Sequence, residues 1–265
     1  MDRRRRLPAA GAVGTALMIL LVLSLTGVTS AKDKPTTVEA GNLLFTFNGG
    51  FSPSKLPKKK LAPISLSASG LIKTKDGTHP PALKETLIET DKNGRVDVTG
   101  LPVCRARELQ SRDTASAEKA CKKAIIGQGS TEVEVALPEQ RPIPVKSKLL
   151  VFNGGKKGSV TTFYIHAFFS APVTGAIVTT VKIKPINKGR YGLLSIASIP
   201  KIAGGSGSVQ SFDLVISKKY TYKGKKMSVL SARCADGKLQ AHATAVFADG
   251  TKASADILRT CTVAG

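Results

Sequence analysis

The stretch PISLSASGLI, residues 63–72, alternates apolar and polar side chains over most of its length. Its even-numbered residues from Ile64 to Ala68 are apolar, and the odd-numbered residues from Ser65 to Ser69 are serines. A repeat of two residues is typical of a β-strand with one face buried and the other in water. This stretch therefore predicts a half-buried strand, followed by a turn at Asp76-Gly77.

Similar apolar segments recur along the chain and are separated by Asn-Gly, Asp-Gly, Lys-Gly or Gly-Gly turn sequences. Around a dozen short strands with frequent turns predict a mainly β fold, an antiparallel β-sandwich or a barrel-like arrangement. Parallel α/β folds are excluded because helices do not intervene between the strands. Residues 86–91 and 95–98 flank Lys92-Asn93-Gly94 and are expected to pair as a hairpin. The further expected strands are 43–47, 131–137, 149–152, 160–169, 175–184, 193–199, 209–217, 226–233, 239–247 and 252–258.

One short helix is expected between Leu109 and Ile125, where four alanines alternate with charged residues. Asp113 or Thr114 is a suitable N-cap, because either side chain can accept a hydrogen bond from a backbone N–H of the first turn.

The four cysteines are expected to form two disulfides, Cys104 with Cys121 and Cys234 with Cys261. An even number of cysteines in an exported chain is typical of a disulfide framework. Metal binding is the rival interpretation, but no Cys-x-x-Cys motif is present and no histidine lies near a cysteine. We therefore expect no metal site.

The N-terminus carries four consecutive arginines, then an apolar segment, then small residues at Thr29 and Ala31. This order predicts a secretory signal peptide, residues 1–31, and hence a secreted protein. An uncleaved N-terminal membrane anchor is the alternative, because about 20 apolar residues can cross a bilayer. Residues 32–41 are expected to be a flexible lead-in, and residues 42–265 a single β-rich domain.

The chain is strongly basic, with 40 Lys plus Arg against 18 Asp plus Glu and a formal net charge of +22. Without residues 1–31, 36 basic and 17 acidic residues would remain, a net charge of +19. Such a protein concentrates near anionic polymers or anionic membrane surfaces. Export argues against a specific nucleic-acid partner, and nothing indicates an oligomeric state.

No catalytic motif and no cofactor-binding motif is apparent. The three histidines, His79, His166 and His242, are far apart in the sequence, and the Gly-rich run at 204–207 is not a Gly-x-Ser-x-Gly nucleophile motif. A glycosidase carboxylate pair depends on distance in space, so it cannot be excluded from sequence separation.

Clusters of lysine are the strongest indication of a binding surface. The cluster from Lys218 to Lys226 also contains Tyr220 and Tyr222. Tyrosine rings can stack on sugar rings while neighbouring lysines contact negative charges. Lys-rich turns also keep a β protein soluble and block pairing of sheet edges, which is the structural alternative. The candidate anion-binding residues are Lys58, Lys59 and Lys60; Lys182 and Lys184; and Lys218, Lys219, Tyr220, Tyr222, Lys225 and Lys226.

Several motifs together resemble a family of uncharacterised secreted actinobacterial proteins. They include FNGGFSP at 47–53, GLPVC at 100–104, IPKIA at 199–203 and FADG at 247–250. The resemblance covers almost the whole exported chain and implies one domain type with four cysteines, but it implies no activity.

These features predict an exported, non-enzymatic protein that associates with an anionic cell-envelope polymer through Lys-rich loops. The alternatives are a secreted hydrolase acting on envelope polysaccharide and a purely structural envelope protein.

Overall fold

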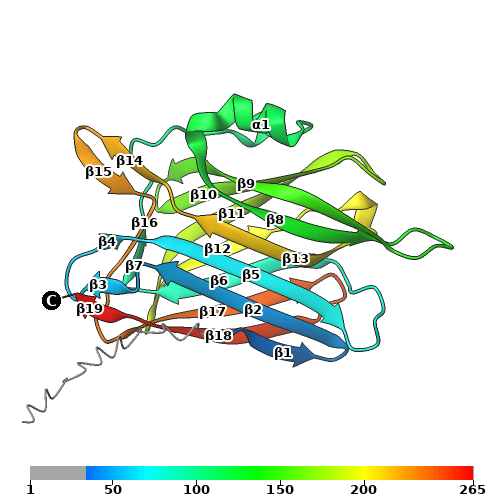
Figure 1. Ribbon diagram of the computed structural model, residues 1–265, viewed down its shortest axis with the longest axis horizontal. Helices are drawn as coiled ribbons and strands as arrows, with labels where there is room; N and C mark the ends of the chain where they lie inside the picture. Colours follow the sequence, from blue (N-terminus) through cyan, green and yellow to red (C-terminus); the bar gives the residue numbers. More distant parts are fainter. Residues whose placement is uncertain (1–33, 265) are drawn as a thin grey trace, which may run out of the picture. The chain divides into compact units, whose positions relative to one another are not determined.

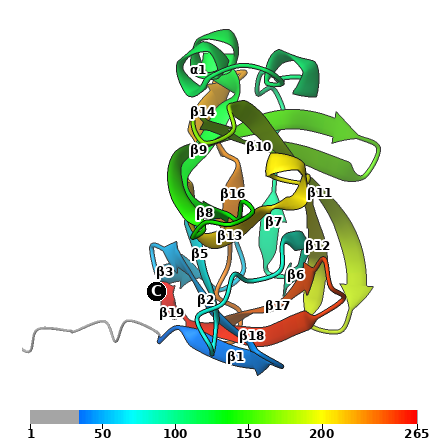
Figure 2. The same cartoon turned by 90° about the vertical axis from the view of Figure 1, so that its right-hand side faces the viewer.

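Twelve antiparallel strands form one sheet that coils until its two edge strands lie against each other (Figures 1 and 2). The computed structural model describes residues 34–264, and the predicted signal peptide lies outside these residues. The strand order is β1-β2-β5-β13-β8-β9-β10-β11-β12-β6-β17-β18. The fold is therefore a nearly closed barrel, which confirms the mainly β prediction in its barrel-like form.

The strands of the barrel are β1 (Thr36–Ala40), β2 (Leu43–Ser52), β5 (Ser65–Thr74), β6 (Leu83–Asp91), β8 (Ile125–Val135), β9 (Ile143–Lys157), β10 (Val160–Phe169), β11 (Gly175–Lys188), β12 (Tyr191–Ser198), β13 (Gly207–Ile216), β17 (Lys238–Phe247) and β18 (Lys252–Thr260). Shorter strands are β3 (Lys55–Pro57), β4 (Ala62–Pro63), β7 (Gly94–Val96), β14 (Lys219–Tyr222), β15 (Lys225–Ser228), β16 (Leu230–Ala232) and β19 (Thr262–Ala264). The helices are α1 (Thr114–Cys121) and the 3₁₀ turns η1 (Ala106–Glu108), η2 (Lys122–Ala124) and η3 (Ala203–Gly205).

Side-chain alternation along the strands determines which residues face the barrel interior. Leu43, Phe45 and Phe47 of β2 are buried, and Phe45 lies opposite the buried Ile72 of β5. The stretch at 63–72 falls in β4 and β5, as its alternation predicted, and Ser67 turns outward. Its hydroxyl donates to the Gly50 carbonyl of the neighbouring strand.

The barrel closes between β1 and β18, whose backbones approach each other without forming a ladder among the described residues. Residues 36–40 had been expected to belong to a flexible lead-in, and this expectation was wrong. They pair with Leu43–Phe47, and Val38 and Ala40 pack on the core. An open strand edge offers backbone hydrogen bonds to almost any sequence, so polar composition did not prevent pairing.

The two ends of the barrel differ in construction. At the β16 end, where β2, β6, β9, β11, β13 and β18 finish, three small sheets occupy the connections (Figure 1). They are β4-β16-β7, the parallel pair β19-β3 and the hairpin β14-β15. The η3 end, where the other six barrel strands finish, has short turns and η3.

The hairpin expected across Lys92-Asn93-Gly94 does not form. β6 pairs with β12 and β17, whereas β7 pairs with β16. At this point the Asp91 side chain accepts hydrogen bonds from the backbone N–H and the side-chain amide of Asn93, both at 3.0 Å. This Asx turn carries the chain away from β6 instead of reversing it.

Helix α1 covers the outer face of the barrel wall rather than an end (Figure 2). Asp113 is its N-cap and accepts from the Ser116 N–H at 2.8 Å, as one of the two predicted caps. The disulfide Cys104–Cys121 joins the helix to the preceding segment, and Cys234–Cys261 joins the β16 end to the C-terminal strand. Both predicted pairings are confirmed.

Two apolar clusters lie inside the barrel, one towards each end, and Ile165 and Leu214 contact both. A third cluster lies under α1 and includes Leu109, Leu150 and Phe152. Within residues 34–264, no helix has the length and apolar character needed to cross a bilayer.

Candidate functional site

Charge is distributed unequally between the two ends of the barrel. Apart from residues 104–124, which carry α1 on the outer wall, the connections at the β16 end are 53–64, 92–103, 158–159, 189–190, 217–237 and 261–264, and they hold 13 basic and two acidic residues. Those at the η3 end are 41–42, 75–82, 136–142, 170–174, 199–206 and 248–251, with three basic and three acidic residues. The β16 end is therefore strongly cationic, whereas the η3 end is neutral.

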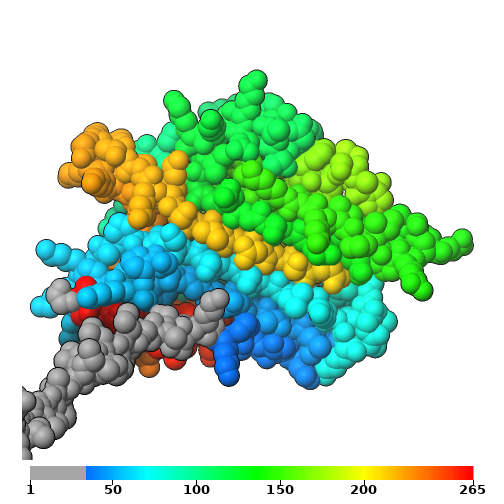
Figure 3. Space-filling view, in the orientation of Figure 1, coloured from blue at the N-terminus to red at the C-terminus, as the bar shows by residue number. Residues whose placement is uncertain are grey.

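Most of these cations have no acidic partner in the part of the chain that the structure describes. Arg95 and Arg190 form ion pairs, Arg233 contacts Asn93, and Lys92 donates to a backbone carbonyl. Nine lysines, in contrast, form no ion pair with any described residue: Lys55, Lys58, Lys59, Lys60, Lys218, Lys219, Lys223, Lys225 and Lys226. We call this set the lysine cluster. The β14-β15 hairpin, which carries Lys219, Lys223, Lys225 and Lys226, projects from the surface (Figure 3).

The fold brings two of the three predicted lysine groups together at one end. Lys58, Lys59 and Lys60 lie between β3 and β4, and the residues from Lys218 to Lys226 lie on or beside the β14-β15 hairpin. The remaining group, Lys182 and Lys184, lies elsewhere, exposed on the outer face of β11. The structure therefore gathers residues that are more than 150 positions apart, although sequence spacing does not relate them.

The two tyrosines of the predicted site already pack against the protein. Tyr220 donates its hydroxyl to the Thr99 carbonyl at 2.9 Å, and burial, with a smaller effect of Asp97, raises the pKa of its phenol. The Tyr222 ring lies over Gly100, where a Cβ would approach to 2.1 Å of a ring atom. Gly100 also has φ +76°, so two constraints favour glycine there. These contacts anchor the hairpin and leave the lysines as its outward groups.

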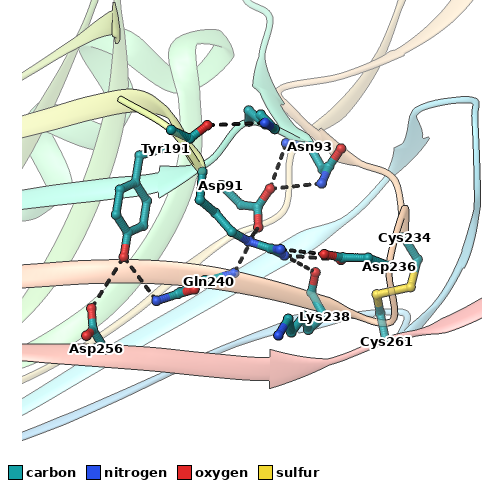
Figure 4. A network of polar contacts seen from close by, with 12 residues as sticks. Asp91, Asn93, Tyr191, Cys234, Asp236, Lys238, Gln240, Asp256 and Cys261 are labelled. Carbon is teal, nitrogen blue, oxygen red and sulfur yellow. Dashed lines mark hydrogen bonds and ion pairs between the residues drawn. A yellow bond between two sulfur atoms is a disulfide. The ribbon is translucent and has the colours of Figure 1, made fainter. Parts of the chain in front are cut away.

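A polar network at the β16 end joins β6, β12 and β17 (Figure 4). Asp91, 4% exposed, accepts from Arg190 Nε at 2.7 Å and from the Gln240 backbone N–H at 3.2 Å. Arg190 also donates to Asp236 and, at 2.7 Å, to the Lys238 carbonyl. The hydrogen bond and charge of Arg190 lower the pKa of Asp236. Sequence reasoning missed this network, because its members are up to 149 residues apart.

The histidines lie in three separate environments. His79 contacts Glu134 and His242 contacts Asp256, each at 2.8 Å. His166 is completely buried, and its Nε2 lies 2.9 Å from the Arg112 carbonyl. Its Nδ1 has no partner among the described atoms.

One group of possible metal ligands occurs among the described residues, Cys104 with Glu108 and Cys121. Both sulfurs are bonded to each other in the disulfide, so neither offers a thiolate to a metal.

A cavity of about 400 Å³ lies inside the barrel, lined mostly by aliphatic and aromatic side chains from both apolar clusters. Among the described residues that line it, Asp91 is the one carboxylate, and it forms an ion pair with Arg190. Hydrolysis of a glycoside commonly uses two carboxyl groups that face a shared space. Within residues 34–264, the cavity lining does not present such a pair.

Comparisons with protein-family models, characterised proteins and solved structures found no match.

Proposed function

We propose that this protein is exported and attaches to an anionic cell-envelope polymer through the lysine cluster at its β16 end. The observation that carries the proposal is the contrast between the two ends, 13 basic against two acidic residues at one and three against three at the other. If lysines served solubility alone, there would be no reason for them to concentrate at one end.

Unpaired lysines also suit the chemistry of such a ligand. A lysine ammonium is a compact, hydrated charge on a flexible stem, so it follows an irregular polyanion without a fixed geometry. Phosphate or carboxylate groups spaced along a polymer could contact several lysines at once. The two disulfides support the location, because they are typical of oxidising compartments outside the cytosol.

The first experiment measures retention of the full chain, expressed for export, on isolated bacterial cell walls before and after removal of their anionic polymers. A salt gradient accompanies each measurement, because exposed charge contacts are screened over about 8 to 10 Å near physiological ionic strength. We expect retention only on walls that keep the polymers, with a steep decrease as salt rises.

A matched pair of charge-reversal variants assigns the surface. The test variant replaces Lys218, Lys219, Lys225 and Lys226 with Glu, and the control replaces Lys84, Arg141, Lys201 and Lys252 with Glu. All four control residues are exposed and lie at or near the η3 end, so both variants change the net charge equally. We expect the test variant to lose retention and the control to keep it. Equal losses would show that only net charge matters and would overturn the proposed surface.

A further inference from the structure

The width of the barrel leaves space that its side chains do not fill. Eight strands make an interior just wide enough to be filled or to hold one small ligand, and the diameter grows with strand number. This barrel has 12 strands. On the wall formed by β12, β6 and β17, six small residues border the cavity: Thr86, Thr90, Ser195, Ala197, Ala241 and Ala243.

Incomplete packing is visible residue by residue on this wall. Thr86, Ile88 and Ala197 point into the barrel, yet each is only half-buried, because each borders the cavity. A volume of about 400 Å³ falls in the range of ligand pockets, roughly 300 to 1,000 Å³.

The cavity has a closed end and an open end. Towards the η3 end its lining is buried, with Phe169 and Ile202 at 7% exposure and Val209 at 9%. Towards the β16 end Leu230 and Ala232 are also buried, at 8% and 1% exposure, but the lining there includes Leu66, 36% exposed, and Arg95, whose side chain is 60% exposed. The cavity therefore opens beside Leu66 and Arg95, at the same end of the barrel as the lysine cluster.

The polarity of the cavity lining also increases towards the β16 end. The charged lining residues are Asp91, Arg95 and Arg259, and all three are at or near the β16 end of their strands. The rest of the described lining is mostly aliphatic and aromatic, with Asn48, Gln240 and several serines and threonines as its polar members. An apolar cavity stays dry and takes apolar guests.

We infer that the barrel binds a single-chain anionic amphiphile, with its aliphatic chain in the cavity and its carboxylate or phosphate head at the β16 end. Roughly 30 Å³ is the liquid volume of a water-sized group, so 400 Å³ holds a chain of about a dozen carbons. The site goes beyond attachment to a polymer, because none of the nine lysines lines the cavity.

Three probes that share one chain test the inference by calorimetry below their micelle concentrations: dodecanoate, dodecan-1-ol and dodecylammonium. We expect one dodecanoate to bind per chain, the alcohol to bind more weakly and the ammonium most weakly. Absence of saturable binding by all three would overturn the chain site. Equal affinities for dodecanoate and the alcohol would overturn the placement of the anionic head.

Neighbouring residues on opposite faces of β12 provide a matched pair of variants. Ala197→Phe places a ring in the cavity, whereas Ser198→Phe places the same ring on the exposed outer face. The ring displaces part of the dodecanoate chain, and each methylene left outside the cavity loses its apolar burial. Ala197→Phe should therefore weaken dodecanoate binding roughly tenfold or more. Ser198→Phe should bind as the unsubstituted protein does, and an equal loss in both variants would contradict the site.

An enlarging variant keeps the test valid if the ring disturbs folding. Ile88→Ala removes a lining side chain, and it should shift the preferred ligand towards a longer chain, from dodecanoate towards tetradecanoate. An unchanged preference would contradict the cavity as the chain site. Failure of polymer attachment is separable, because Ala197→Phe should lose dodecanoate binding while it keeps wall retention.

Discussion

Asp91 is the residue on which the β16 end most depends. It is 4% exposed and accepts four hydrogen bonds, from Arg190, the Gln240 backbone and two donors of Asn93. Donors on every side compensate for the desolvation of its charge. The carboxylate therefore fixes the ends of β6, β12 and β17 around the mouth of the cavity.

Replacement of Asp91 by Asn should strongly destabilise the protein, because Arg190 would lose its buried partner. Removing one member of a buried ion pair typically costs about 3 to 5 kcal/mol. Urea denaturation followed by circular dichroism measures the change. Asp236→Asn removes the exposed partner of the same arginine and should cost clearly less; if the two variants lost equal stability, the central role of Asp91 would be refuted.

His166 is the second residue with a defined consequence, this time for pH dependence. Burial lowers the pKa of His166, against smaller opposing effects of the Arg112 carbonyl and the Asp113 carboxylate. The unfolded chain therefore binds a proton more readily than the folded one. Stability should be complete above the ordinary histidine pKa of about 6.5 and should decrease as pH falls below it.

Denaturation curves of the protein and of His166→Gln between pH 7.5 and about pH 5 measure this contribution. The variant should be less stable at neutral pH but should lose less stability on acidification. His242→Gln, on the exposed face, serves as the control for loss of a histidine. A His166 variant with the same pH slope as the unsubstituted protein would disprove the assignment.

At the scale of elements, local sequence determines where the strands and the helix form. It does not determine which strands pair with each other. The alternation at 63–72 and the N-cap at Asp113 act within a few residues, and both predictions are confirmed. Pairing of β7 with β16 instead of β6 joins segments more than 130 residues apart. No turn sequence encodes it, because it depends on the Asp91 network and on which strands reach the same end.

The seam of the barrel is an element-scale feature that one side chain supports. β1 covers β2 only as far as Phe47. Beyond that point Arg259 of β18 donates to the Gly49 carbonyl and, at 3.0 Å, to Asn48 Oδ1, so its guanidinium bridges β18 and β2.

Substitution of Arg259 by Met should loosen this seam while preserving the strands themselves. We expect faster hydrogen exchange in β1 and β18, with β9 and β10 unchanged. Arg259→Lys keeps the charge but not the planar fork of donors, so it should restore protection only in part. Full protection in the Met variant would show that the backbone contacts of β1 hold the seam alone.

At the scale of the whole molecule, the excess of positive charge and the exposed part of the cavity lining lie at the same end of the barrel. The lysine cluster lies at the end where the cavity lining is exposed, at Leu66 and Arg95, and the lining towards the neutral η3 end is buried. An anionic surface that attracts the β16 end would therefore bring the open end of the barrel against it. The two proposals describe neighbouring sites that can act together but fail independently.

From the residues alone one can derive the β class, the short capped helix, both disulfides and an excess of positive charge. Each depends on residue type and on neighbours along the chain, such as the alternating serines at 65–69 or the spacing of Cys104 and Cys121. The near-closure of the barrel, the gathering of Lys58 with Lys218, the Asp91 network and the cavity are seen only in the tertiary structure. They depend on which strand ends meet when the sheet coils. The cavity depends also on how much of the interior of a wide barrel its inward side chains can fill.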